Sequence, residues 1–177
     1  MKSPLLPILA ALGLSAGAVV PLAPADQAQA QRTRGPSWAT RTYVMKAGAG
    51  DLYEIQSSEL ALRRSRRADV RETAEMMIRD HRGTTATVTE AARRDGVPVR
   101  PPMLEAAQRT MMRQLERASG PAFDRLYLTQ QMTAHSQALA LHRSYARTGD
   151  ARALRQAAAS AVPVVQGHIA HLRRLRR

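Results

Sequence analysis

The chain contains no cysteine, and only 3% of its 177 residues are aromatic. Without cysteine the protein cannot form a disulfide, a thiolate metal site or an acyl anchor on a cysteine. Runs of β-branched residues are also missing, whereas alanine, leucine, methionine and arginine are abundant. This composition is typical of helices. The sequence therefore predicts an all-α protein that is stabilised by packing.

Long apolar runs are also scarce, since only one, from Leu5 to about Leu22, is long enough to interact with a bilayer. Lys2 precedes this run and the small-residue tripeptide ending at Ala30 follows it, which is the pattern of a cleaved secretory signal peptide. We therefore expect a periplasmic or secreted protein with no transmembrane segment in the mature chain. The predicted organisation is a signal peptide (1–30), a flexible arm (31–39) and one domain (40–177).

Acidic residues are few, 14 against 27 basic ones, which gives a net charge of +13. Such a surface attracts anionic lipid or glycan. Solvated arginine-rich helix faces explain the same charge without a partner, because the arginines are scattered along the chain. Export and the shortage of aromatic stacking residues disfavour nucleic-acid binding.

Hydrophobic periodicity predicts four long helices and one short one. The expected ranges are about 40–66, 69–95, 103–118 (the short helix), 121–147 and 150 to the C-terminus. Asp69 and Asp150 are the expected N-caps of the second and last helices, and Gly96 and Gly149 the expected stops. Short turns make each flanking pair of long helices antiparallel, whereas residues 96–120 form a long crossover. The predicted fold is a ferritin-like four-helix bundle with a crossover that carries a short extra helix.

Each long helix carries one polar residue in the middle of an apolar heptad seam: Glu54, His81, His135 and His168. At ~1.5 Å per residue, the first three lie at similar depths, and His168 lies roughly 7 Å farther along unless Pro163 kinks its helix. Three imidazoles and a carboxylate suit iron, copper or zinc. No Glu-x-x-His pair is present, which disfavours a di-iron carboxylate centre. The alternative interpretation is a buried polar network without metal.

Four further residues are secondary candidates for this site. Glu59 lies on a rival seam, and if that seam faces inward, Glu54 is a solvent residue. Met77 and Met132 lie one turn from histidines and would favour copper(I), although methionine at helical spacing is usually core filler. Asp80 is expected to be an outer partner or a surface residue. His142 and His171 lie toward helix ends, where we expect solvent exposure.

Five short segments together are similar to a known family. They are Asp51-Leu-Tyr-Glu54-Ile, Met77-Ile-Arg-Asp80-His81, Phe123-Asp124-Arg-Leu-Tyr127, Ala134-His135 and Pro163-Val-Val-Gln-Gly-His168. In this order and spacing they resemble the exported bacterial ferritin-like family known as domain of unknown function 4142. The resemblance implies a ferritin-like bundle in the cell envelope and no established activity. It favours Glu54 over Glu59 and marks Asp80 and the three seam histidines. Many members have an acidic residue where this chain has Ala134.

The sequence contains neither a nucleophile with a matched base nor a glycine-rich phosphate loop, so hydrolases and nucleotide-binding proteins have no support. Two hypotheses remain open. The first is a bundle that binds a divalent transition metal between its helices, and the second is a metal-free structural or envelope-interaction protein. The sequence does not establish an enzyme and favours a protein without catalytic activity, while a redox-active metal at this site would allow an oxidase or metal-buffering role.

Overall fold

The computed structural model describes residues 35–175, which form five helices and no strands. The helices are α2 (Trp38–Arg64), α3 (Ala68–Arg94), α4 (Ala106–Arg117), α5 (Gly120–Thr148) and α6 (Arg152–Leu175). The predicted signal peptide and the first residues of the predicted arm lie outside the described residues. No helix in the described part is both long and apolar enough to cross a bilayer. The prediction of an all-α protein is confirmed.

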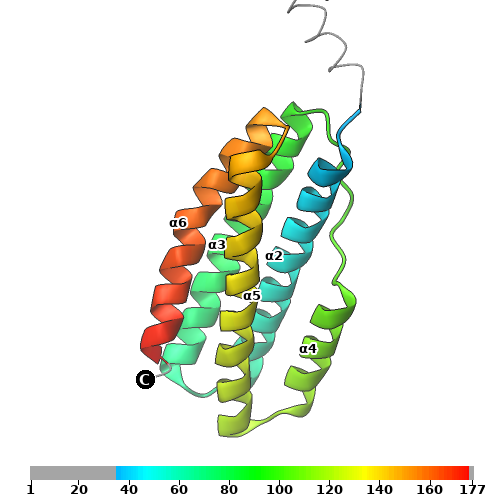
Figure 1. The fold of residues 1–177 in the computed structure, drawn as a ribbon. Coiled ribbons are helices and arrows are strands. Elements are labelled where there is room, and N and C mark those ends of the chain that lie inside the picture. The colour runs from blue at the N-terminus through cyan, green and yellow to red at the C-terminus, as the bar shows by residue number, and fades with distance from the viewer. Residues whose placement is uncertain (1–34, 176–177) are drawn as a thin grey trace, which may run out of the picture. The chain divides into compact units, whose positions relative to one another are not determined.

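The four long helices pack side by side as a helical bundle (Figure 1). α2 and α3 are antiparallel neighbours, as are α5 and α6, while α3 also packs against α6 and α2 against α5. The segment between α3 and α5 runs from one end of the bundle to the other. It carries α4, which packs on the outside of α2 and α5.

Several helix ends follow from local sequence. The Ser37 side chain accepts a hydrogen bond of 3.0 Å from the Thr40 N–H, so α2 begins two residues before its expected start. Gly96 adopts a left-handed backbone with φ of 67° just after α3, as predicted. Gly149 follows α5 and donates its N–H to the Tyr145 carbonyl at 2.8 Å, which confirms the predicted stop.

Two predicted N-caps are wrong. Asp69 lies inside the first turn of α3, which begins at Ala68, and its carboxylate pairs with Arg67 at 2.6 Å. The N-terminus of α6 is capped by Asp95, at the end of α3, and not by Asp150. The Asp95 carboxylate accepts the backbone N–H groups of Ala153 (3.1 Å) and Leu154 (2.8 Å). Sequence-local patterns miss this cap because its acceptor comes from another helix.

Two apolar clusters fill the bundle core. The Tyr43 cluster lies near the α3 C-terminus and contains Tyr43, Ala47, Val88, Ala91, Ala92, Val97, Tyr145, Leu154, Ala157 and Ala158. The Leu115 cluster lies near the opposite end and contains Leu60, Ala61, Val70, Ala74, Met77, Leu115, Phe123, Tyr127, Leu128 and Leu172. Every long helix places buried polar residues between its contributions to the two clusters. A polar layer therefore separates two apolar halves of the core.

Candidate metal centre

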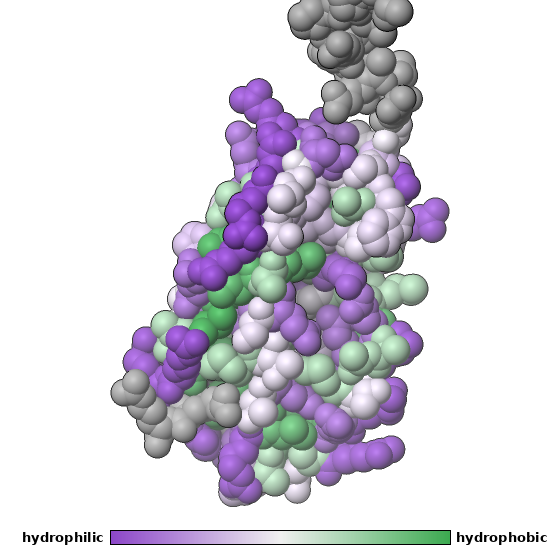
Figure 2. Space-filling model, viewed as in Figure 1, coloured by the Kyte–Doolittle hydropathy of each residue, from purple (hydrophilic) through white to green (hydrophobic). Residues whose placement is uncertain are grey.

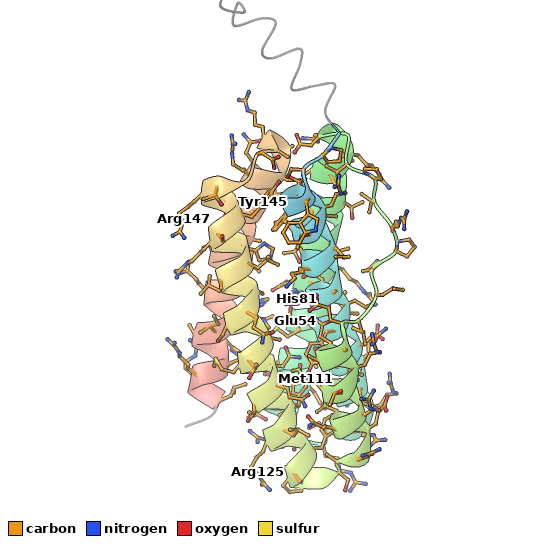
Figure 3. The ribbon with its side chains drawn as sticks, turned by 45° about the vertical axis from the view of Figure 1, so that its right-hand side comes forward. Glu54, His81, Met111, Arg125, Tyr145 and Arg147 are labelled. Carbon is orange, nitrogen blue, oxygen red and sulfur yellow. The ribbon has the colours of Figure 1, made fainter. Side chains whose placement is uncertain are left out.

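The polar layer contains the four seam residues, one from each long helix. Glu54 of α2, His81 of α3, His135 of α5 and His168 of α6 are each at most 3% exposed. Figure 3 shows Glu54 and His81 near the middle of the bundle. His168 reaches the same layer although α6 continues unbroken through Pro163. All four residues that the heptad seams single out are therefore buried in this layer.

Nitrogen and oxygen atoms of these four side chains converge. His135 Nε2 lies 3.0 Å from His168 Nδ1 and 3.4 Å from His81 Nε2. Glu54 Oε2 lies 2.7 Å from His81 Nε2. One ring nitrogen from each of the three histidines falls within a group whose atoms are all within 4.8 Å of one another.

The other ring nitrogen of each histidine faces an oxygen acceptor. His81 Nδ1 donates to Asp51 Oδ1 at 2.9 Å, and His168 Nε2 donates to Asp80 Oδ2 at 3.0 Å. His135 Nδ1 donates to the backbone carbonyl of Gln131 at 2.8 Å. Histidines that bind metals are oriented by outer hydrogen bonds of this kind, which fix the ring tautomer.

These outer hydrogen bonds decide which nitrogens carry lone pairs. A neutral imidazole has one N–H and one lone pair, so each histidine that donates outward presents its inner nitrogen as an acceptor. Burial lowers the pKa values of His135 and His168, so these two neutral rings turn lone pairs toward each other, whereas His81 Nε2 can carry a second proton and donate it to Glu54. Two lone pairs that face each other in a dry interior repel unless a cation lies between them.

The Glu54 carboxylate also has a hydrogen-bond acceptor without a donor. Its Oε1 atom is buried and receives no hydrogen bond. It lies 3.1 Å from His135 Nδ1, but the N–H of that nitrogen is directed at the Gln131 carbonyl. An ionised carboxylate oxygen without a donor is costly in a protein interior, and a bound cation would remove the cost.

The electrostatics of the layer are strongly coupled. Burial acts to raise the pKa of Glu54, but the charges of His135 and His81 outweigh it and lower that pKa below its ordinary range. Burial acts to lower the pKa of His81, but the Glu54 charge and the hydrogen bond to Asp51 raise it instead. Burial lowers the pKa of His168 to about 4. At pH 7 Glu54 is therefore ionised, His168 is neutral and His81 is protonated.

Asp51 is a buried member of the polar layer that the sequence analysis did not single out as a candidate. Its carboxylate is 6% exposed and accepts hydrogen bonds from His81 and from the hydroxyls of Thr84 (3.0 Å) and Thr85 (2.8 Å). Asp51, Glu54 and His81 form a second group of closely spaced ligand atoms. The available signal was spacing, because residues three apart share one face of a helix.

Of the four secondary candidates, only Asp80 forms a hydrogen bond with a histidine of the polar layer. Asp80 is the outer partner of His168, with a side chain 28% exposed. Glu59 lies at the surface, where it pairs with Arg82 at 3.3 Å, so the rival α2 seam does not face the centre. Met77 belongs to the Leu115 cluster, and Met132 packs against that cluster.

The expectation of solvent exposure was wrong for His142. This residue is 4% exposed, and its Nδ1 lies 3.1 Å from the Tyr43 hydroxyl. The Tyr43 ring stacks on Tyr145 and meets the His142 ring edge-on. His171 is half-buried and its Nε2 lies 2.8 Å from the Thr73 hydroxyl. Neither histidine belongs to the group of three.

Comparison with known proteins places this architecture in a family. Residues 23–175 match the family described as domain of unknown function (DUF4142). The chain belongs to this family. No curated protein and no solved structure matches the chain. Membership of DUF4142 carries no activity with it, so function must be argued from the buried polar layer.

Proposed function

We propose that this DUF4142 protein is an exported, ferritin-like four-helix bundle that binds one divalent transition metal ion. The proposed ligands are His81 Nε2, His135 Nε2, His168 Nδ1 and a carboxylate oxygen of Glu54. The observation that carries the proposal is the convergence of one ring nitrogen from each of three buried histidines, with Glu54 Oε2 2.7 Å from the nitrogen of His81. The order of the helices supports the ferritin-like part, because short connections join each antiparallel pair and a long crossover links the pairs.

The spacing of the donor atoms supports a tetrahedral ion. Four ligands held 2.0–2.1 Å from an ion at the corners of a tetrahedron lie about 3.3 Å from one another. The two nitrogen–nitrogen distances, 3.0 and 3.4 Å, bracket that value. The contact of 2.7 Å between Glu54 and His81 is shorter and matches a charge-assisted hydrogen bond.

The donor set narrows the choice of metal. Three imidazoles and one carboxylate suit zinc, copper or iron, whereas calcium and magnesium prefer oxygen ligands. Copper(I) bound through thioethers loses its support, because Met77 and Met132 pack with the Leu115 cluster. Zinc, copper(II) and iron remain the candidates.

The alternative to a metal centre is a metal-free polar network formed by the same residues. In that state His81 carries a second proton and donates to both Asp51 and Glu54, which would make the layer a structural polar network. The two accounts differ in what replaces that proton. A metal ion would displace it from His81, so metal uptake would release a proton into solution.

Metal content tests the proposal directly. We expect protein purified without chelator, or incubated with zinc, copper(II) or iron(II), to retain close to one ion per chain by elemental mass spectrometry. His135→Gln should lose the ion while its helical circular dichroism is retained. His171→Gln is the control, because it removes a half-buried histidine that lies outside the cluster.

Each result has a defined meaning. Retention of one ion by wild type and His171→Gln, with loss in His135→Gln, supports the metal centre. Equal metal content in wild type and His135→Gln would contradict it. No bound ion in wild type under any of these conditions would leave the polar network as the function of the layer.

The basic surface supports a second, weaker candidate. Figure 2 shows hydrophilic residues spread over the visible face and not gathered into one patch. With a net charge of +13, binding to anionic lipid or glycan would be a property of the whole surface. Sedimentation with anionic vesicles tests this candidate, and we expect any binding to disappear as salt is raised.

A further inference from the structure

A pocket of about 340 Å³ lies between α2, α4 and α5. Its wall includes Asp51 and Glu54, so one of the proposed metal ligands faces the pocket. A second pocket, of about 520 Å³, lies between α3 and α6 and meets the layer at Asp80, an outer partner of His168, and at Thr84, which donates to Asp51, but its lining includes none of the proposed ligands. The two pockets approach the metal centre from different sides, and the pocket beside α4 reaches a ligand.

The lining of the α4 pocket is acidic although the protein is strongly basic. It includes three carboxylates, from Asp51, Glu54 and Glu105, and one ammonium, from Lys46. His142 also lines it, and burial lowers the pKa of that imidazole, so it adds no charge at pH 7. A chain of net charge +13 therefore carries a pocket that attracts cations.

The inner part of the pocket includes the buried carboxylate whose pairing is incomplete. Glu54 is 1% exposed, and its Oε1 atom receives no hydrogen bond. A cation that reached this oxygen would meet the first of the four proposed ligands. The acidic pocket and the unpaired Oε1 atom of Glu54 are independent observations, and both favour a cation as the ligand.

Gly50 gives a third observation. A glycine inside a helix costs about 1 kcal/mol relative to alanine, so an interior glycine usually has a packing reason. Gly48 has one, because a Cβ there would lie 3.1 Å from Pro102 Cβ. Gly50 has none, since its Cβ would meet nothing within 4 Å, and the same is true of Gly83 in the α3–α6 pocket. It lines the pocket, where any side chain would occupy free space.

We propose that the α4 pocket is the path by which a hydrated divalent cation enters and leaves the buried centre. In this role Glu105 and Asp51 attract the cation, Gly50 keeps the path open, and Glu54 receives the ion. This inference rests on the proposed metal-binding function and adds the route to it.

Blocking each pocket separately tests the route. Metal-depleted wild type, Gly50→Phe and Gly83→Phe would be mixed with zinc(II) or cobalt(II), and uptake followed by stopped flow. Gly83 is the matched control, because it is also helical, lines the α3–α6 pocket, and has open space at its Cβ. We expect Gly50→Phe to load at least tenfold more slowly than wild type, to the same final stoichiometry, and Gly83→Phe to load at the wild-type rate.

Charge changes give a second test that leaves the pocket open. Glu105→Gln keeps a side-chain oxygen at the start of α4 but removes a negative charge, so it should slow uptake by about two- to fivefold. Lys46→Gln removes the positive charge and should speed uptake by a similar factor. Both effects should shrink as salt screens the field. If both variants take up metal at the wild-type rate at low salt, electrostatic attraction of the cation into this pocket is contradicted.

The outcomes separate this inference from the function on which it rests. If wild type binds no metal at equilibrium, the metal centre itself is wrong. If wild type binds one ion but Gly50→Phe loads as fast, or Gly83→Phe is the slow variant, the metal centre stands and the α4 route is overturned. Ala138→Phe, on the α5 wall of the same pocket, replaces Gly50→Phe if circular dichroism shows that variant to be unfolded.

Discussion

His135 Nε2 lies 3.0 Å from His168 Nδ1, and neither nitrogen has a proton to donate to the other. The hydrogen bonds from His135 to the Gln131 carbonyl and from His168 to Asp80 place both protons on the opposite sides of the rings. Two lone pairs held at this distance in a dry core are unfavourable alone and favourable around a cation. This relationship supports the proposed metal centre.

The first prediction concerns stability. A ligand that binds only the folded state stabilises it by ~3 kcal/mol when its free concentration is 100 times its Kd. Adding zinc should therefore raise the melting temperature of metal-depleted wild type, and chelator should reverse the rise. Differential scanning calorimetry measures the shift. His135→Gln should not respond to either addition, and an equal response in that variant would place the bound ions elsewhere.

The second prediction concerns Asp51, which orients His81 without being one of the four proposed ligands. Asp51→Asn removes the charge that holds the proton on His81 Nδ1. Loss of such an outer partner typically lowers metal affinity 10- to 100-fold. Competition with a chromophoric chelator measures the affinity, and the stoichiometry should stay at one. Asp69→Asn, at the surface, is the control, and an unchanged Kd in Asp51→Asn would remove Asp51 from the site.

The third prediction concerns pH. Burial lowers the pKa of His168 from 6.5 to about 4. Between pH 6.5 and 4, His168 is protonated in the unfolded chain but stays neutral in the folded protein. The metal-depleted protein should therefore lose stability as pH falls through this range. The expected contribution of this group is ~3 kcal/mol, fully present above pH 6.5. Urea unfolding at pH 7.0, 5.5 and 4.0 measures it.

A matched variant isolates this contribution. Burial also lowers the pKa values of His135 and His142, which adds to the loss in the same direction. His168→Asn should therefore keep part of the pH dependence and lose the share that belongs to His168. If His168→Asn and wild type lose equal free energy of unfolding between pH 7.0 and 4.0, the conclusion that burial keeps His168 neutral in the folded protein is wrong.

The fourth prediction tests the bundle independently of metal. Asp95→Ala leaves the N–H groups of Ala153 and Leu154 without their carboxylate acceptor. Loss of an N-cap acceptor costs about 0.5–2 kcal/mol. Chemical denaturation should show this loss, whereas Glu90→Ala, at an exposed site on the same helix, should change stability by less than about 0.5 kcal/mol. Equal effects of the two substitutions would remove the capping role.

The heptad pattern predicted the helices and the four central residues because burial repeats along each helix. Glu54 and Glu59 could not be separated in this way, since two seams of α2 are both apolar enough to face inward. The structure shows Glu59 paired with Arg82 at the surface. Asp51 and His142 were missed for a different reason. Their burial depends on partners from other helices, Thr84 and Tyr43, which no local pattern reveals.

The most direct test of the metal centre is anomalous scattering from crystals of the zinc- or cobalt-loaded protein, measured on both sides of the absorption edge of the metal. The account predicts one strong peak per chain, about 2 Å from His81 Nε2, His135 Nε2 and His168 Nδ1. An anomalous map with no peak among these nitrogens, or with peaks only at surface residues, would contradict it.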